Sequence, residues 1–312
     1  VFGPGDEGAA AKARGQARND KRITSELGNV SPVIVMPGSW TESELRFQAE
    51  NVATQLANNG GFNCNAVKVL ILHEGWSLKQ EFMAMLKAVL AAIPQRHAYY
   101  PGAADRYDRF VSEHPNAEPI GDRTDSVLPW TILPDVDAGR PDQRCFGEEA
   151  FCGIVAQTVL PGANAGEYLK GAVAFCNEHI WGTLNAGIII DPRTEKALGP
   201  DFEAAIDALK VGSVAINHWA GLCYGFGSTA WGGYPGQPLN DVQSGIGAVH
   251  NTFLFDQPQK TVLRGPFVAA PKPPWFVTHG RTHKVAPRIL EMEMKPSLTK
   301  IPGIAYHAFR GS

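Results

Sequence analysis

A cysteine on a glycine-rich loop is the residue of this chain whose surroundings best suit covalent chemistry. Cys64 ends the segment Asn59–Cys64 (NGGFNC), which lies between a predicted helix and a predicted apolar strand. Glycines let the backbone turn tightly and leave peptide N–H groups accessible. A thiol beside such groups has the nucleophile and the oxyanion donors that acyl transfer needs. Cys64 is therefore a candidate nucleophile, although a lone cysteine is more often a small buried core residue.

Two kinds of partner for this thiol occur in the sequence. Glu26 stands just before the apolar run of residues 33–36, and a partly desolvated carboxylate at such a junction has a raised pKa and can act as a general base. His73 and His218 offer instead the partner that a cofactor-independent cysteine hydrolase would use. The residue types alone leave both arrangements open.

Composition and charge exclude several classes of function. The 312 residues carry 28 Lys and Arg against 31 Asp and Glu, a formal net charge of −3. Binding to nucleic acid or to a membrane surface needs a basic face, so this balance argues against both. The five cysteines form no C-x-x-C pair, which disfavours a disulfide framework and a zinc site. We expect reduced thiols, a cytoplasmic location and no bound metal.

The elements that must position these residues alternate between strand and helix, as in crossover units around a parallel sheet. The predicted strands are residues 33–36, 66–72, 154–160, 186–190 and 211–216, and the predicted helices are residues 41–58, 80–92, 165–179 and 201–210. Thr41 and Glu44 have the spacing of a capping box. Residues 94–142 read as irregular with one strand over 128–133, and the proline-rich sequence from Pro258 predicts an extended tail that makes no core.

The first glycines match a dinucleotide-binding motif whose structural context is missing. Gly3–Gly8 (GPGDEG) matches G-x-G-x-x-G, but a dinucleotide fingerprint needs a full strand before it, and only Val1 and Phe2 precede. The simpler interpretation is a glycine turn before a helix that Asp6 caps.

Six short segments, in one order, resemble those of a single enzyme family. Ser25–Pro32 (SELGNVSP) is similar to the E-L-G-G-x-x-P segment of aldehyde dehydrogenases, and Asn59–Cys64 is similar to their N-x-G-Q-x-C segment. The segments that resemble further family motifs downstream are Glu148–Gly153 (EEAFCG), Gly212–Asn217 (GSVAIN), Trp231–Gly233 (WGG) and Ser244–Gly247 (SGIG). By this resemblance the chain is identified as a member of the aldehyde dehydrogenase superfamily, over Glu26 to Gly247 and within the carboxyl-terminal part of the family's length.

The resemblance implies an NAD(P)-dependent enzyme that oxidises an aldehyde to a carboxylic acid. Cys64 would attack the aldehyde to give a thiohemiacetal, and hydride transfer would leave a thioester. Glu26 would activate the water that hydrolyses this thioester. The implied fold is α/β, a three-layer parallel-sheet catalytic domain of aldehyde dehydrogenase type with a remnant of the dinucleotide-binding domain.

The same resemblance assigns residues to the cofactor, NAD or NADP. Glu149 would hold the hydroxyls of the nicotinamide ribose, with Phe151 and Leu27 nearby, and Gly5 would belong to a strand-to-helix segment facing the diphosphate. The family's oxyanion-stabilising asparagine and its adenosine-side lysine would lie upstream of Val1, so we expect a truncated chain without a complete active site.

Two positions differ from the family's motifs, and three aromatic residues stand where the family lines its substrate pocket. Phe62 stands where the family has glutamine, and Asn29 replaces the second glycine of E-L-G-G. The aromatic residues Trp219, Tyr224 and Phe226 follow the strand of residues 211–216, where the family lines its aldehyde entrance, although ordinary packing under a long loop explains them as well.

The predicted organisation has three parts: residues 1–26 as the remnant of the NAD(P)-binding domain, residues 27–257 as the catalytic domain, and residues 258–312 as a tail that is a candidate for oligomerisation. We expect a homo-oligomer, by analogy with the family, and no nucleic-acid or membrane partner. Two alternatives stay open: a truncated or non-catalytic aldehyde-dehydrogenase-like subunit, and the thiol hydrolase.

Overall fold

The structure, a computed structural model, describes residues 1–140, 142–250 and 254–312 of the chain, and its centre is one eight-stranded sheet. The strands lie in the order β10-β8-β7-β2-β3-β6-β5-β4, and all neighbours are parallel except β4 and β5. These strands are β2 (Ser31–Val35), β3 (Val67–His73), β4 (Glu118–Ile120), β5 (Trp130–Leu133), β6 (Ile154–Leu160), β7 (Asn185–Ile189), β8 (Ser213–Ile216) and β10 (Thr261–Arg264). A separate antiparallel pair joins β1 (Ser25–Glu26) to β9 (Gly245–Ile246).

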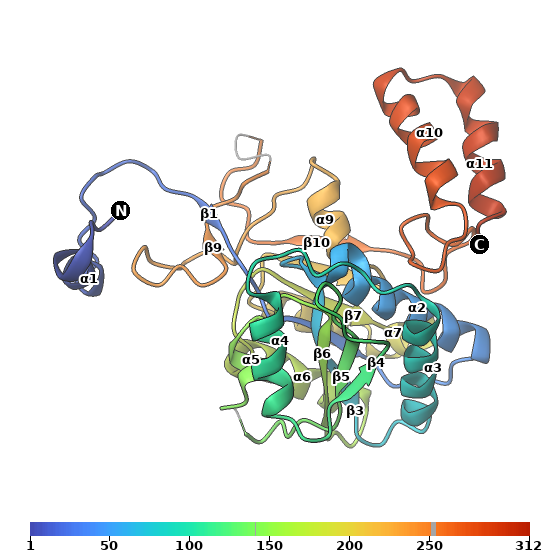
Figure 1. Ribbon diagram of the computed structural model, residues 1–312, viewed down its shortest axis with the longest axis horizontal. Coiled ribbons are helices and arrows are strands. Elements are labelled where there is room, and N and C mark those ends of the chain that lie inside the picture. The colour runs from blue at the N-terminus through green and yellow to red at the C-terminus, as the bar shows by residue number, and fades with distance from the viewer. Residues whose placement is uncertain (141, 251–253) are drawn as a thin grey trace.

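Helices cover both faces of the sheet and make three layers (Figure 1). The α-helices are α1 (Gly5–Ala13), α2 (Glu42–Ala57), α3 (Lys79–Ala92), α4 (Ala103–Ser112), α5 (Arg144–Gly147), α6 (Ala165–His179), α7 (Pro192–Leu198), α8 (Pro200–Ala208), α9 (Gly221–Gly225), α10 (Thr282–Met294) and α11 (Ile301–Phe309), with 3₁₀ turns at Asn58–Gly61 and Leu298–Lys300. One hydrophobic core lies between the sheet and α2 with α3, and another between the sheet and α4, α5, α6 and α8. The predicted three-layer α/β fold with a parallel sheet is confirmed.

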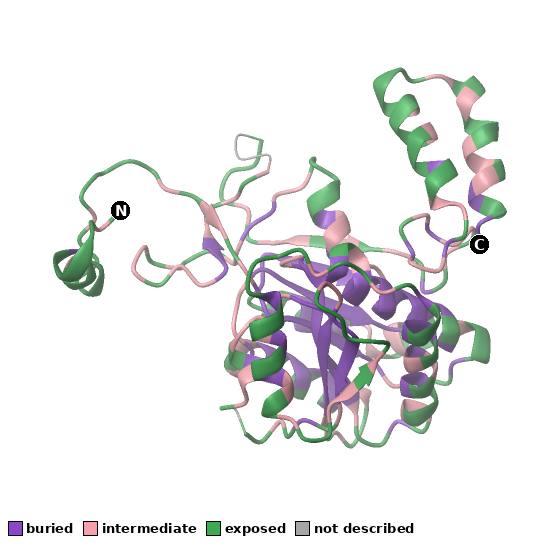
Figure 2. Ribbon diagram, in the orientation of Figure 1, coloured by how far each residue is buried: buried purple, intermediate pink, exposed green. Residues whose placement is uncertain are grey.

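The strands at the centre read as continuous apolar runs because both of their faces are covered. Every residue of β2 and β7 is buried, and so are all residues of β3 except its last. Strands of this kind are typical of parallel sheets between helix layers. Figure 2 shows the resulting contrast, with buried strands in the middle and exposed outer helix faces.

The predicted strands and helices of the central region are confirmed to within a few residues. The capping box is also present: the Thr41 side chain accepts a hydrogen bond from the Glu44 N–H, and the Glu44 carboxylate accepts one from the Thr41 N–H at 2.7 Å. Both orphan groups of the first turn are thereby satisfied, which fixes where α2 begins.

The prediction that residues 94–142 are irregular is wrong for residues 103–112, which form α4. Ala103, Tyr107 and Phe110 of this helix are buried on one side, at the spacing of a helical stripe. Pro101 and Gly102, which suggested a loop, lie immediately before the helix, and Gly102 adopts the left-handed φ of 72° at its N-cap.

The prediction that the sequence from Pro258 forms an extended tail without a core is also wrong. Strand β10 pairs in parallel with β8 of the same chain, with Thr261 opposite Ser213, so the tail completes its own sheet edge. Beyond it, α10 and α11 form an antiparallel hairpin that projects from the body (Figure 1). The proline-rich composition favoured an extended chain over the two helices. Strand β10 has only four residues, which alternate between partly buried and exposed, and the sequence does not show that it pairs within its own sheet.

At the amino end, α1 lies apart from the sheet and is almost wholly exposed (Figure 2). The expected cap by Asp6 is absent: the N-cap is Pro4, and Asp6 lies within the first turn. The division of the chain at residues 26 and 257 stays a prediction. Within the described parts of the chain, no helix combines the length and apolarity needed to cross a bilayer.

Candidate active site

The candidate site is a cavity of about 720 Å³ at the amino ends of three neighbouring strands. Glu26 comes before β2, Cys64 before β3 and Glu149 before β6, and these strands are adjacent in the order β2-β3-β6. Ligands of open α/β sheets usually lie at the carboxyl ends of strands, so this placement is unusual. The residues that line the cavity are Glu26, Leu27, Gly28, Asn58, Phe62, Asn63, Cys64, Asn65, Tyr100, Glu149, Phe151, Trp219, Gly221 and Tyr224.

A sharp turn delivers the cysteine to this cavity. Asn59, Gly60 and Gly61 have φ of 51°, 70° and 82°, three consecutive residues in the left-handed region that favours glycine and asparagine. After the turn, the Cys64 carbonyl accepts hydrogen bonds from Ser31 Oγ at 2.9 Å and from Asn185 Nδ2 at 3.4 Å. The backbone of Cys64 is therefore held by side chains from two strands.

The thiol of Cys64 is protonated at rest. Burial raises the pKa of Cys64 well above its ordinary value, and the charge of the nearby Glu26 carboxylate raises it further. A thiol is a weak nucleophile, so attack on a carbonyl requires that a base remove its proton. The neighbouring carboxylate is the group placed to do so.

Glu26 is itself held by two contacts. The strand pairing of β1 with β9 places Glu26 opposite Gly245, and the Trp231 indole donates from Nε1 to Glu26 Oε1 at 3.3 Å. Gly245 has a φ of 140°, and a Cβ there would press on the Ser25 carbonyl and Glu26. The small sheet thus fixes the carboxylate beside the thiol.

Glu149 lines the same cavity from another direction. Burial raises the pKa of Glu149 to about 7, although the charges of Lys68 and Arg106 and a hydrogen bond from the Asn29 N–H act in the opposite direction. Its Oε1 is buried and has no hydrogen-bond partner. A buried acceptor without a donor fits a ligand that brings hydroxyl groups, such as the ribose of a nicotinamide nucleotide.

The two departures from the family pattern have visible structural roles. Asn29 is fully buried: its Nδ2 donates to Ser31 Oγ and the Asn185 carbonyl, and its Oδ1 accepts from the Leu184 N–H and the Ser244 hydroxyl. Phe62 packs in an aromatic cluster with Tyr99, Tyr100 and Phe151, with ring centroids 5.1 to 6.0 Å apart. Of this cluster, Phe62, Tyr100 and Phe151 line the cavity. Tyr100 is a lining residue that the sequence analysis did not predict, although the Tyr99-Tyr100 pair is a visible aromatic signature.

Trp219 and Tyr224 also line the cavity. Trp219 donates from Nε1 to the Asn65 carbonyl at 2.7 Å, and Tyr224, on α9, makes an edge contact with Trp231 at 5.7 Å between ring centroids. Phe226 is exposed at the end of α9 and does not line the cavity. Gly5 lies on α1, outside this cavity as well.

The two histidines considered as partners of Cys64 lie elsewhere. His73 is at the far end of β3 and contacts the Gly162 carbonyl at 2.9 Å through Nε2. His218 packs against Trp275, and burial lowers its pKa. Neither lines the cavity that holds Cys64, which weighs against the thiol hydrolase. Among residues 1–140, 142–250 and 254–312, no three His, Cys, Asp or Glu side chains come close enough to hold a metal ion.

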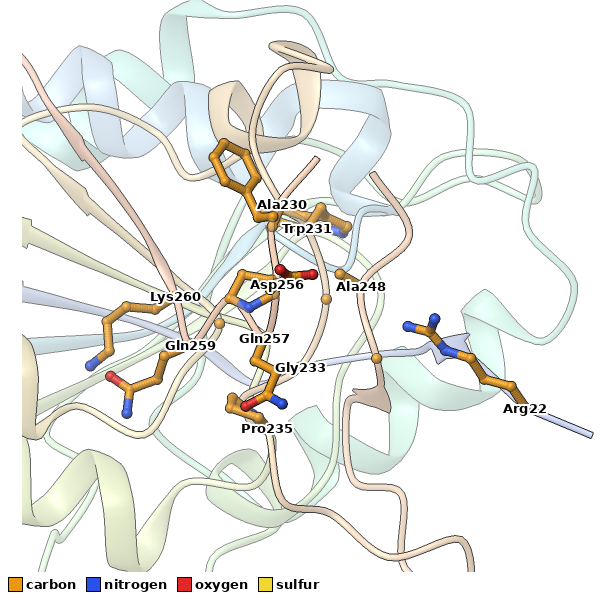
Figure 3. A pocket seen from close by; sticks show the side chains of 15 residues that line it. Arg22, Ala230, Trp231, Gly233, Pro235, Ala248, Asp256, Gln257, Gln259 and Lys260 are labelled. Carbon is orange, nitrogen blue, oxygen red and sulfur yellow. The ribbon is translucent and has the colours of Figure 1, made fainter. Parts of the chain in front are cut away.

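A second cavity, of about 490 Å³, lies between the glycine-rich loop of residues 230–235 and the segment 255–260. Figure 3 shows Asp256 and Gln257 in its middle, with Arg22 at one edge and Lys260 at the other. The Lys260 ammonium donates to three carbonyls at the end of α8. None of the residues predicted to act on substrate or cofactor lines this cavity.

Comparison with solved structures identifies the architecture. An NAD-dependent aldehyde dehydrogenase from Sinorhizobium meliloti matches with a TM-score of 0.59 and 21% identity, over 78% of this chain and 45% of that one. Lactaldehyde dehydrogenase from Escherichia coli matches with a TM-score of 0.59 and 19% identity, over 80% and 49%. The NADP complex of an NADP-dependent glyceraldehyde-3-phosphate dehydrogenase from Bacillus halodurans matches with a TM-score of 0.59 and 18% identity, over 78% and 47%.

Comparisons of the sequence with protein-family models and with curated proteins give no match. The chain spans about half the length of the solved structures it resembles. The parallel sheet, the two helix layers and the matched structures agree, and the fold of this chain is that of the catalytic domain of the aldehyde dehydrogenase superfamily.

Proposed function

We propose that this chain carries the catalytic centre of an NAD(P)-dependent aldehyde dehydrogenase that releases a carboxylic acid. The observation that supports this most is the meeting of Cys64, Glu26 and Glu149 in one cavity, from three segments that precede adjacent strands. The solved structures of the same fold include NAD and NADP complexes of aldehyde dehydrogenases. Homo-oligomerisation and a cytoplasmic location stay predictions.

In this proposal Cys64 performs the covalent step. Glu26 accepts the thiol proton, the sulfur adds to the aldehyde carbon, and the carbonyl oxygen takes up a proton to give a thiohemiacetal. When bound, NAD(P)⁺ would supply the hydride acceptor needed to oxidise the thiohemiacetal to an acyl thioester. Glu26 then takes a proton from the water that attacks the thioester, the C–S bond breaks, and the acid leaves while the thiol is restored.

Other lining residues bind rather than react. Glu149 would hold the ribose hydroxyls of the cofactor, because its buried Oε1 lacks a donor, and Phe151 and Leu27 would contact the cofactor from the same side. Trp219 and Tyr224 would contact the aldehyde, which favours an apolar or aromatic one. Gly5 and Phe226 lie outside this cavity, so their assigned roles have no support in the geometry of the cavity.

The test is aldehyde-dependent formation of NAD(P)H by the purified full-length protein. Cys64→Ala should abolish it, because no other group in the cavity can form the thioester. Cys176→Ala is the matched control, since Cys176 is a buried residue of α6 outside the cavity and its loss should leave the rate unchanged. Retained activity in Cys64→Ala would show that the nucleophile is wrongly assigned.

A further inference from the structure

A lysine lies inside the most apolar strand of the sheet. Lys68 is the second residue of β3, and it is only 3% exposed among valines, leucines and isoleucines. A buried ammonium group is costly unless hydrogen bonds replace its water. Its Nζ donates to the Gly61 carbonyl at 3.0 Å and to the Cys152 carbonyl at 2.7 Å. Two backbone carbonyls, and not a carboxylate in direct contact, therefore hold the Lys68 ammonium in place.

These two carbonyls belong to the two loops that carry the predicted chemistry. Gly61 belongs to the left-handed turn before Cys64, and Cys152 follows Glu149 and Phe151. The loops touch at this point: a Cβ at Gly61 would lie 2.7 Å from the carbonyl carbon of Cys152. Lys68 therefore bridges the nucleophile loop and the Glu149 loop where their backbones are closest.

The Glu149 loop is also strained, so it needs support. Phe151 has a φ of 43°, a left-handed conformation that a bulky side chain rarely adopts. A second cation supports the same turn: Arg106 donates from Nε to the Ala150 carbonyl at 3.3 Å, and its guanidinium lies 6.0 Å from the centre of the Phe151 ring. The turn thus has one cation on the carbonyl before Phe151 and another on the carbonyl after it.

We infer that Lys68 is a positioning residue: its two hydrogen bonds fix the Cys64 loop against the Glu149 loop, and its charge favours the carboxylate form of Glu149. The inference that this serves the cofactor rests on the proposed function. The positioning itself rests only on the contacts of Lys68.

The charged groups around Glu149 act in opposite directions. Lys68 from β3 and Arg106 from α4 favour its carboxylate, as does the Asn29 N–H, while burial and the Glu26 carboxylate on β1 oppose it. Glu149 in turn raises the pKa of Cys64. Of the two cations, Lys68 has the larger effect on Glu149, so its loss should raise the pKa of Glu149 further.

The experiment follows the titration of Glu149 directly, by carbon-13 NMR of the protein labelled at its glutamate carboxyls, with Glu149→Gln for assignment. Lys68→Met removes both charge and donors, Lys68→Gln keeps an amide donor, and Lys68→Arg keeps the charge. The control is Lys260→Met, which removes another ammonium that donates to backbone carbonyls, in the second cavity. The rate at which iodoacetamide alkylates Cys64 is measured on the same samples.

We expect Lys68→Met and Lys68→Gln to move the Glu149 midpoint upward by about one pH unit and to change the alkylation rate of Cys64 several-fold. Lys68→Arg should stay near the wild-type midpoint, and Lys260→Met should alter neither readout.

Three results would overturn the inference: an unmoved midpoint in the neutral variants, an equal shift in Lys68→Arg, or failure of both neutral variants to fold while Lys260→Met folds, which would leave Lys68 a purely structural residue. Neither readout requires aldehyde oxidation, so these results do not depend on whether the proposed function is correct.

Discussion

Cys64 and Glu26 restrain each other in the free protein. After burial, the charge of the Glu26 carboxylate contributes most to raising the pKa of Cys64. The arrangement keeps Cys64 protonated and places the proposed base near it. A cysteine in this state resists oxidation and alkylation until the proton is taken, because the thiolate is the reactive form.

Glu26→Gln should therefore have opposite effects on two reactions of the same sulfur. The pKa of Cys64 falls when the carboxylate charge is removed, so alkylation by iodoacetamide at pH 8 should become several-fold faster. Hydrolysis of the acyl thioester should slow by a factor on the order of 10²–10⁴, because its general base is lost. Stopped-flow alkylation and single-turnover acylation measure the two rates. If both rates fall together, Glu26 does not restrain the thiol as the geometry indicates.

Deprotonation of Glu149 should lower the free energy of unfolding as the pH rises. Its pKa is about 7 in the folded chain, above the ordinary glutamate value of 4.5, so between these values the unfolded chain binds fewer protons than the folded one. The free energy of unfolding therefore falls across this interval, and the loss is complete above about pH 7. Discounted for the partial exposure of Glu149, the loss should be about 1–2 kcal/mol.

Glu149→Gln should remove this part of the pH dependence, and urea denaturation at pH 5 and pH 8 measures it. The control is Glu178→Gln, on the exposed side of α6, which should leave the difference between the two pH values as in the wild type. An unchanged difference in Glu149→Gln would assign the pH dependence to other groups.

At the scale of elements, the site depends on loops that approach each other backbone to backbone. The turn of Asn59, Gly60 and Gly61 holds three left-handed residues, and Gly61 packs directly on the Cys152 backbone. No side chain fits between them. The close approach is what lets one lysine reach both loops.

Gly61→Ala should destabilise the chain by more than about 2 kcal/mol, because alanine disfavours a φ of 82° and its Cβ would meet the Cys152 backbone at 2.7 Å. The matched control is Gly171→Ala, on the exposed side of α6 with no atom within 4 Å of the added Cβ. It should stabilise the chain by about 0.5–1 kcal/mol through helix propensity. Thermal unfolding of both variants checks the signs, and equal signs would contradict the packing argument.

At the scale of the whole molecule, the segment after β10 ties the projecting hairpin to α2. The Gln48 amide donates to the Phe267 carbonyl at 2.5 Å, the Val277 N–H donates to Thr54 Oγ1 at 3.1 Å, and the Lys272 ammonium pairs with the buried Glu50 carboxylate at 2.8 Å. The α10–α11 hairpin itself buries few side chains, mainly Val285 and Ala308. The segment after β10 is therefore held by more specific contacts with α2 than the two helices of the hairpin have buried side chains between them.

Lys272→Met should cost about 3 kcal/mol of unfolding free energy, because it leaves the Glu50 carboxylate buried without its partner. Arg310→Met, an exposed cation at the end of α11, should cost less than about 0.5 kcal/mol. Denaturation of the double variant Glu50→Gln, Lys272→Met should recover most of the loss. A small effect of Lys272→Met alone would show that water already reaches this ion pair.

The sequence by itself determined the local elements and the residue types of the candidate site. Hydrophobic periodicity, the capping box at Thr41 and the glycines before Cys64 are short-range features, so they predict helices, strands and turns without knowledge of the partner elements. Glu26, Cys64 and Glu149 could be proposed because each stands in a recognisable short segment. The lysine within the apolar strand of residues 66–72 was equally visible, but its meaning depends on which carbonyls lie opposite it.

Only the tertiary structure decided that β2, β3 and β6 are neighbours, so that Glu26, Cys64 and Glu149 open into one cavity and Lys68 meets two loops. It likewise placed Gly5 and Phe226 outside that cavity, and it formed α4, β10 and the hairpin where local composition suggested loop and tail. The physical reason is that strand order and loop contact are set by pairing and burial between residues far apart in the chain. Propensity acts over a few residues, whereas the site joins residues more than a hundred positions apart.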